Sequence, residues 1–215
     1  MKKIKMSDAI IGTCIGAGIT LITSLFAQCV ALHMKKTSSK EKFFETKREN
    51  SNKVYQTLIS IINIYPKESP NDVLDIIEFP PVYHLESFDA VLKSLEYKLE
   101  DYTEILKTNN LELERKNNIQ TQIYNIKYVT KKITEIRDEY KKASDRYKQF
   151  CESDKVIFDL YAGQNVKNSL VKFDVIIHNV FISGNCAQDA DDNFIEMYRR
   201  DLIQELRKDI GIIKQ

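Results

Sequence analysis

The chain is poor in the residues that build turns, and it contains no tryptophan. Among its 215 residues are only 6 glycines and 4 prolines. A fold of many short strands would need more turn residues than this, so the composition favours a few long helices. Gly12, Gly16 and Gly18 lie close together, but they fall inside an uncharged apolar segment, which excludes a phosphate-binding glycine loop there.

Motifs for catalysis and metal binding are also lacking. The sequence has no CxxC or Cys/His spacing typical of zinc sites, no GxSxG turn, and no Ser/His/Asp or Cys/His set that spacing would suggest. The acidic stretch from Asp189 to Asn193 begins like a calcium loop. Its sixth position is Phe194 and its twelfth is Arg200, where glycine and a bidentate acid are required. We therefore predict a non-enzymatic protein with no cofactor and no metal ion.

Charge is unevenly distributed along the chain, although the net formal charge is only +1. Residues 1–48 carry nine lysines and arginines against three acids, and the remainder carries 23 against 28, so the net charges are +6 and −5. A nucleic-acid footprint should lie on the folded domain, and this distribution argues against nucleic acid as the ligand. It favours contact of the N-terminal part with anionic lipid headgroups, for which the candidate residues are Lys35, Lys36, Lys40 and Lys42.

The longest uncharged segment runs from Ala9 to Leu32. As a helix, its 24 residues would span roughly 36 Å, enough to cross a ~30 Å hydrocarbon core. A cleaved signal peptide has a shorter apolar core and a small-residue cleavage site, whereas here Lys35 and Lys36 follow at once. We predict a retained transmembrane helix at residues 9–34, and hence a single-pass protein of the cell membrane.

The lysines and arginines around this helix predict its direction. Three precede it and six follow it closely, which favours a cytoplasmic C-terminal side. The spacing of Gly12 and Gly16 lets two helix backbones approach closely, so this face predicts a homodimer or higher oligomer. The alternative is an outward-facing C-terminal domain, which predicts a disulfide between Cys151 and Cys186.

Apolar residues beyond the anchor recur in steps of three and four, as on the buried face of a helix. The pattern predicts that the anchor continues as a helix to Tyr65, that a helix covers 86–107, and that one long helix covers 111–162. The seam of the long helix, from Ile126 to Phe150, has a near-3.5 repeat and follows a short connection. These two helices are therefore expected to form an antiparallel hairpin, although the same seam serves pairing within one chain or between chains.

Helix caps and corners complete the predicted fold. Asn71 or Asp72 is expected to cap a short helix, and Asp191 or Asp192 the last helix. We interpret the Pro80-Pro81 pair as a corner between helices, although a proline-rich surface segment can also dock in an aromatic groove. The predicted fold class is all-α, with a short basic N-terminus (1–8), a transmembrane helix (9–34), a juxtamembrane helix (35–65) and a helical bundle domain (66–215) that packs with the juxtamembrane helix.

The segment after the anchor carries a resemblance. A hydrophobic span, then Lys35-Lys36, then residues 42–49 (KFFETKRE) leading to Tyr55, is similar to a layout common in uncharacterised bacterial single-pass membrane proteins. Many of these are encoded in prophages, mobile elements or phage-defence loci, and the Lys/Ile/Asn-rich composition resembles proteins of low-GC Gram-positive bacteria. The resemblance covers about the first quarter of the chain, contains no diagnostic motif and implies a membrane-tethered interaction or effector role.

Together these observations predict a membrane-anchored, non-enzymatic helical scaffold or protein-interaction module, with a phage-defence or exclusion effector as one subtype. Its predicted partners are the lipid bilayer, further copies of the chain and a protein that the sequence does not identify. Two alternatives stay open: an outward-facing surface or adhesion-like helical domain, and a helical enzyme whose site the spacing does not reveal.

Overall fold

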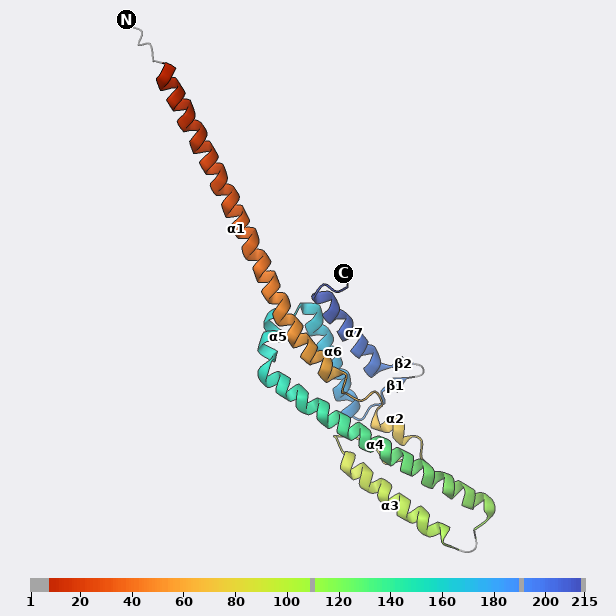
Figure 1. Cartoon of the computed structure of the whole chain (residues 1–215). Helices are drawn as coiled ribbons and strands as arrows, with labels where there is room; N and C mark the ends of the chain where they lie inside the picture. Colours follow the sequence, from red (N-terminus) through yellow and green to blue (C-terminus); the bar gives the residue numbers. More distant parts are fainter. Residues whose placement is uncertain (1–7, 109–110, 190–191, 214–215) are drawn as a thin grey trace. The chain divides into compact units, whose positions relative to one another are not determined.

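The structure is a computed structural model, and it describes residues 8–108, 111–189 and 192–213. Within these ranges, the side chains of residues 8–25, 39–40, 43–44 and 189 are not described. The described chain is helical almost throughout, which confirms the predicted all-α class (Figure 1). In chain order the helices are α1 (Asp8–Ile62), α2 (Pro70–Leu74), α3 (Phe88–Leu106), α4 (Leu113–Ser153), α5 (Lys155–Tyr161), α6 (Gln164–Phe181) and α7 (Phe194–Asp209).

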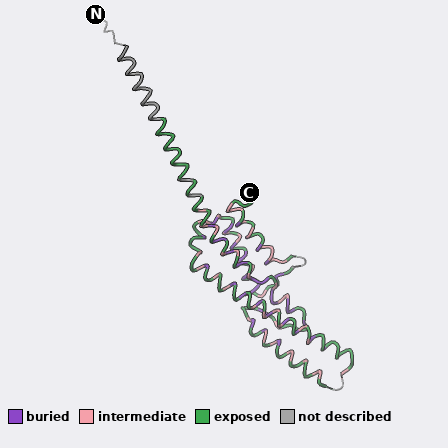
Figure 2. Tube along the Cα trace, in the orientation of Figure 1, coloured by how far each residue is buried: buried purple, intermediate pink, exposed green. Residues whose placement is uncertain are grey.

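The chain divides into two compact units, Met1–Glu49 and Asn50–Gln215, here called unit 1 and unit 2. In unit 1, the described side chains from residue 26 to residue 38 are all exposed (Figure 2). Within the described residues, no helix combines the length and the apolar character that crossing a bilayer requires. In the predicted transmembrane helix, residues 9–34, the side chains are described only from residue 26 onward. This helix therefore stays a prediction.

The core of unit 2 joins the last turns of α1 to α4, α6 and α7. Its centre is aromatic: the Tyr140 ring stacks on Phe181 with the centroids 4.6 Å apart, and Tyr65 meets Phe173 edge-on at 5.7 Å. Offset and edge-on arrangements of this kind stabilise a core beyond the apolar area they bury. The buried stretch of α1 and the residues after it supply Val54, Tyr55, Leu58, Ile61, Ile62 and Tyr65.

Helices α3 and α4 form the predicted antiparallel hairpin (Figure 1). Seven of the eight predicted seam positions of α4 are buried, and the eighth, Tyr147, is half-buried. The buried stripe also begins earlier than predicted, at Ile119 and Gln122. From α3, Phe88, Val91 and Leu95 face this seam as fully buried residues.

The predicted long helix over 111–162 is wrong in its second part, because α4 ends at Ser153 and α5 begins at Lys155. The break turns Phe158 back into the core, where it is 3% exposed. There its ring lies 6.0 Å from that of Phe150 and 6.2 Å from that of Tyr55. The gain from burying this ring explains a break at Asp154, where the sequence has neither glycine nor proline.

Two predicted helix caps are also wrong. Ser69 rather than Asn71 or Asp72 caps α2: its hydroxyl accepts from the Asp72 N–H at 3.0 Å, and Asp72 bonds back to the Ser69 N–H. This reciprocal pair is a capping box. Asn193 caps α7 by accepting from the Glu196 N–H at 2.9 Å. A two-residue antiparallel pair, β1 (Gln188–Asp189) with β2 (Asp192–Asn193), precedes α7 and places Asn193 at that helix start.

Candidate functional site

The most unusual surface of unit 2 lies in the connector, which we define as residues 63–87 between α1 and α3. Its second half, residues 76–86, is here called the proline loop. Four large apolar side chains of this loop are exposed: Ile76 by 45%, Phe79 by 82%, Val82 by 76% and Leu85 by 71%. Single exposed apolar residues are ordinary, but four within ten residues of an irregular segment need an explanation.

The backbone of the proline loop is strained. Phe79, Leu85 and Glu86 have φ values of 51°, 51° and 55°, and they are the described non-glycine residues with positive φ. Side chains with a Cβ rarely adopt this left-handed region, and each instance costs on the order of 1–2 kcal/mol. Such a conformation persists only where surrounding contacts determine it.

Asn71 and Tyr83 hold the loop from within. The Asn71 amide donates to the carbonyl oxygens of Tyr83 at 3.0 Å and Gly184 at 2.5 Å, and its own oxygen accepts from the Tyr83 N–H at 3.0 Å. The Tyr83 side chain is fully buried, and its hydroxyl donates to the carbonyl oxygen of Phe181 at 2.9 Å. One amide and one phenol therefore fix the middle of the loop to α2 and to the end of α6.

The two ends of the loop are held separately. The Leu85 N–H donates to the Ile182 carbonyl oxygen at 2.8 Å, next to the C-terminus of α6. At the other end, the Lys98 ammonium of α3 donates to the carbonyl oxygens of Glu78 at 2.9 Å and Phe79 at 2.6 Å. The exposed apolar tip thus sits on a base fixed at three places, which makes it a preorganised surface.

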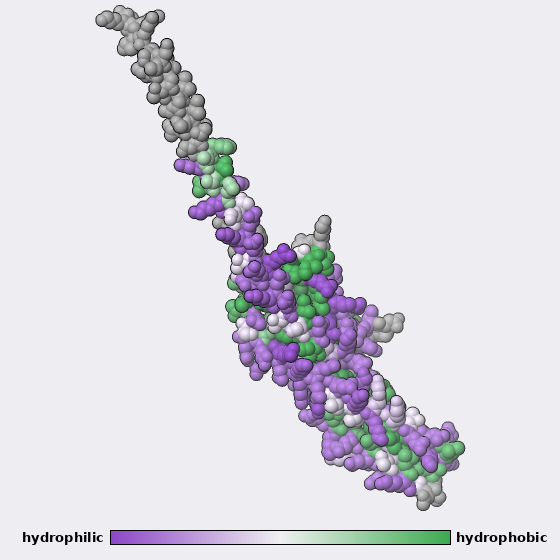
Figure 3. Space-filling model, viewed as in Figure 1, coloured by the Kyte–Doolittle hydropathy of each residue, from purple (hydrophilic) through white to green (hydrophobic). Residues whose placement is uncertain are grey.

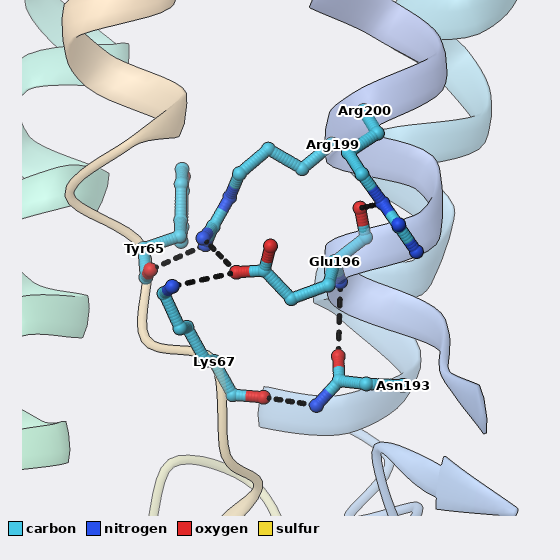
Figure 4. A network of polar contacts seen from close by, with 6 residues as sticks. All are labelled: Tyr65, Lys67, Asn193, Glu196, Arg199 and Arg200. Atoms are coloured by element: carbon cyan, nitrogen blue, oxygen red, sulfur yellow. Dashed lines mark hydrogen bonds and ion pairs between the residues drawn. The ribbon is translucent and has the colours of Figure 1, made fainter. Parts of the chain in front are cut away.

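A buried arginine fixes the first half of the connector to α7 (Figure 4). Arg199 is 5% exposed and donates to the Tyr65 carbonyl oxygen at 2.6 Å and to the Glu196 carboxylate at 2.5 Å. The same carboxylate pairs with the Lys67 ammonium at 3.3 Å. Asn193, the α7 cap, donates to the Lys67 carbonyl oxygen at 2.8 Å. Bonds donated by a charged guanidinium or ammonium are the stronger ones in proteins. The bonds of Arg199 to Tyr65 and of Asn193 to Lys67 join residues that are 134 and 126 positions apart.

Burial lowers the pKa of the Arg199 guanidinium, and the carboxylates of Glu196 and Glu139 oppose that change. The Nε of Arg199 has no hydrogen-bond partner among the described residues. A buried ion pair of this type is weak evidence for stability but stronger evidence for a fixed arrangement. We therefore interpret Arg199 as a structural residue that positions the connector.

A charged cleft of about 450 Å³ lies between the start of the connector and α4. Lys132 of α4 pairs with Glu68 across it at 3.5 Å. Its charged lining is balanced in sign, and this balance gives it no preference for an anion or a cation. Its charged residues are Lys67, Lys132, Lys142, Glu68, Glu135 and Glu139.

Three tyrosine–carboxylate pairs account for other ionisable groups in unit 2. The Tyr55 hydroxyl donates to Asp209 at 2.6 Å, that of Tyr140 to Glu86 at 2.5 Å, and that of Tyr147 to Asp174 at 2.7 Å. Each pair joins segments far apart in the sequence. Burial raises the pKa of Asp174 above its ordinary value, against the opposing effect of the Tyr147 hydrogen bond. These pairs connect elements of the core, and we assign them a structural role.

The residues predicted to contact lipid or a second helix lie in unit 1. Lys35, Lys36 and Lys42 are exposed, whereas the side chain of Lys40 lies outside the described set. Gly12 and Gly16 belong to α1, but their surroundings also lie outside the described set. The helix contact and the lipid contact therefore stay predictions.

The cysteines of unit 2 and the polar residues at the start of α7 bear on the predicted disulfide and on the calcium-loop pattern. Cys151 and Cys186 are both free thiols. Asn193 and Glu196, which belong to the stretch that begins like a calcium loop, serve the α7 cap and the Arg199 network. Within the part of the chain that the structure describes, no group of histidine, cysteine, aspartate and glutamate is arranged to hold a metal ion.

The sequence predicts a corner at Pro80-Pro81 and leaves open a proline-rich surface segment, but it indicates neither the four exposed apolar side chains of the loop nor the residues that hold it. The predicted capping role of Asn71 is wrong, because its amide bonds to Tyr83 and Gly184, and no sequence pattern indicates the roles of Lys98, Tyr83 and Arg199. Only the density of apolar residues beside the two prolines signals this surface in the sequence. Comparisons of the chain with protein-family models, with curated proteins and with solved structures found no match.

Proposed function

We propose that this chain is a membrane-anchored, non-enzymatic interaction module, with the helical bundle of unit 2 in the cytoplasm. One observation carries the proposal: unit 2 maintains an exposed apolar loop in a strained conformation by means of polar contacts from Asn71, Tyr83 and Lys98. Holding apolar side chains rigidly in water stabilises nothing in the isolated chain. It lowers the entropy lost on binding, which is what a preorganised binding surface needs.

Anchoring is supported by the sequence and by the described end of the predicted span. Ala9–Leu32 has no formal charge, and Phe26, Leu32 and Met34 are exposed on α1. Figure 3 shows the first coloured part of this helix as a mainly hydrophobic patch, directly before a hydrophilic stretch. Exposed apolar residues followed by lysines are typical of a helix that leaves a bilayer among its headgroups.

The non-enzymatic part of the proposal is supported by how unit 2 uses its ionisable groups. The buried Arg199 bonds to a backbone carbonyl and a carboxylate, and the tyrosine hydroxyls bond to carboxylates on other segments. Each of these groups is committed to a partner within the fold. Catalytic groups, in contrast, converge on a space that a substrate can enter.

The anchoring is tested by alkaline extraction of membranes from cells that express the full chain. We expect the chain to stay in the membrane pellet and a variant lacking residues 9–34 to be released. Fusions of a fluorescent protein and of alkaline phosphatase to the C-terminus then report the side of unit 2. Fluorescence without phosphatase activity is the expected result, and phosphatase activity without fluorescence would make the outward-facing domain the better description.

Self-association is the remaining part of the proposal. If Gly12 and Gly16 form a packing face, leucine at both positions should separate the helices and reduce the dimer signal in a bilayer association assay. Gly18→Leu is the matched control, because residue 18 lies on another face of the same helix. An equal reduction by the control would assign the effect to insertion rather than to a specific contact.

A further inference from the structure

We propose that the proline loop is a docking surface for a protein partner with a concave apolar groove and a basic rim. The inference rests on the proposed function, since it names the kind of partner that the interaction module binds. The residues that would enter the groove are Phe79, Val82 and Leu85, with Pro80 and Pro81 between them.

The form of the loop favours a groove rather than a flat surface. Residues 80–84 belong to no helix or strand. Pro80 and Pro81 have no N–H, so this stretch presents carbonyl oxygens and apolar side chains but few donors. A proline-containing segment of this composition is recognised through its apolar side chains in an apolar or aromatic groove.

The loop differs from the other exposed apolar residues of unit 2. Val156 and Leu160 on α5, and Val171 and Val175 on α6, are also exposed. They occupy regular helices four residues apart, where exposure requires no backbone strain. In the proline loop, the exposed Phe79 and Leu85 are themselves two of the residues with positive φ, so the fold maintains this exposure against a conformational cost.

Charge identifies the partner as basic and argues against a lipid surface. Asp75, Glu78 and Glu86 are all exposed at the edges of the loop. Lys98 donates to the Glu78 and Phe79 carbonyl oxygens and keeps its positive charge there, so it offsets one of these three negative charges. An acidic edge repels anionic headgroups, and complementary charge on the partner would be positive.

A second copy of unit 2 fits the loop poorly. Residues 50–215 carry 23 basic and 27 acidic side chains, a net charge of −4. The recess on the α3–α4 surface, where Leu92 and Leu99 lie, is lined by two acids, Asp89 and Glu96, and by two cations, Lys93 and Arg137, that pair with them. This balanced lining offers no net positive charge to complement the acidic edge of the loop.

The test is photocrosslinking of the full chain in living cells, with a benzophenone amino acid in place of Val82. We expect one discrete heteromeric adduct, and mass spectrometry should place the crosslink beside apolar and Lys/Arg residues of the partner. Phe79→Ser with Leu85→Ser should reduce the adduct about tenfold, as expected for central apolar anchors. Asp75→Lys with Glu78→Lys should reduce it by a similar factor, because it removes the complementary charge.

The controls separate docking from folding and from anchoring. Val171→Ser with Val175→Ser removes a similar apolar area elsewhere and should leave the adduct unchanged, and the melting temperature of each variant shows whether the fold is retained. An adduct of two copies, an adduct with lipid, or no adduct in a folded chain would overturn the proposal. Alkaline extraction of the same cells reports anchoring independently, so loss of anchoring with a retained adduct would refute the proposed function but not the docking surface.

Discussion

Arg199 on α7 donates through Nη2 to the backbone carbonyl oxygen of Tyr65, 2.6 Å away and 134 residues earlier in the chain. Tyr65 directly follows the last helical turns of α1 and is buried. Its carbonyl oxygen would lack a partner without this bond, and unpaired buried carbonyls are disfavoured. The last helix of the bundle therefore fixes the start of the connector.

Replacing Arg199 by methionine should lower the free energy of unfolding by about 2–3 kcal/mol, because Tyr65 and Glu196 lose a buried donor. Chemical denaturation of the full chain in detergent, followed by circular dichroism, measures the change. Arg200→Met is the matched control, since Arg200 is exposed and its Nε lies 3.3 Å from the Glu196 carbonyl oxygen. We expect less than about 0.5 kcal/mol there, and equal losses for the two variants would contradict the assignment of Arg199.

Gly184 should be the least replaceable glycine after α6. It has a φ of 77°, and a Cβ at this position would overlap the carbonyl oxygen of Tyr83. Gly184→Ala should therefore destabilise the chain by about 2–4 kcal/mol, from backbone strain and from the overlap together. Because the overlap displaces the proline loop, hydrogen exchange of residues 82–86 should also become faster.

Gly211 offers the control for that substitution. Its φ is 75°, but a Cβ there would meet nothing within 4 Å. Gly211→Ala should cost only the strain, about 1 kcal/mol, and should leave exchange in the loop unchanged. If both variants lost the same stability, the close approach of Gly184 to Tyr83 would have no energetic importance.

Asp174 predicts a pH dependence. Burial raises its pKa in the folded chain above the ordinary 3.8, although the Tyr147 hydroxyl opposes the shift. Between the two values the folded state binds more protons than the unfolded state, so stability falls as the pH rises through the folded pKa. This contribution is fully present below about pH 3.8 and is lost as the pH rises through the folded pKa of Asp174.

Asp174→Asn removes that ionisation, so the variant should gain stability relative to the natural chain as the pH rises from 3.5 to 7. Denaturation curves across this range measure the difference between the two chains. Asp145→Asn, at an exposed position of α4, changes the net charge equally. A difference that stays constant with pH for Asp174→Asn would refute the raised pKa.

The helical core was predictable because its pattern is local. Steps of three and four along α4 identify Ile126, Val129, Ile133 and Ile136 as core residues, and the structure buries all four. The buried positions of such a stripe can be predicted without knowing which element packs against it, because any apolar helix face must be covered. The short connection before α4 then leaves an antiparallel neighbour as the simplest arrangement.

The polar contacts that hold the connector were not predictable from one sequence. Arg199 lies in step with the apolar stripe of α7, four residues after Ile195 and three before Leu202, but this spacing does not show that an arginine is buried there. Its partner, the Tyr65 carbonyl oxygen, is 134 residues away. Asn71 is likewise a good helix cap by its chemistry, yet it bonds to Tyr83 and Gly184. A polar side chain such as that of Asn71 can form several different hydrogen bonds, and tertiary contacts decide which one forms. A sequence pattern shows only which hydrogen bonds are possible.

The strain in the proline loop gives the last prediction. Leu85 has a φ of 51° and is 71% exposed, so its side chain adds little to the core while its backbone carries a left-handed conformation. Glycine adopts this conformation freely, but it loses more entropy on folding. Leu85→Gly should therefore leave the free energy of unfolding unchanged or raise it by up to about 1 kcal/mol.

Val82→Gly is the matched comparison, because Val82 is 76% exposed in the same loop and is not among the residues with positive φ. There only the entropic loss remains, and we expect a loss of about 0.5–1 kcal/mol in the free energy of unfolding. Chemical denaturation of both variants measures the difference. If Leu85→Gly were the more destabilised of the two, the positive φ would carry no cost, and the argument that this loop is maintained for binding would lose its basis. The expected result, a neutral or stabilised Leu85→Gly chain that no longer docks, would show that a leucine is kept there at the expense of stability.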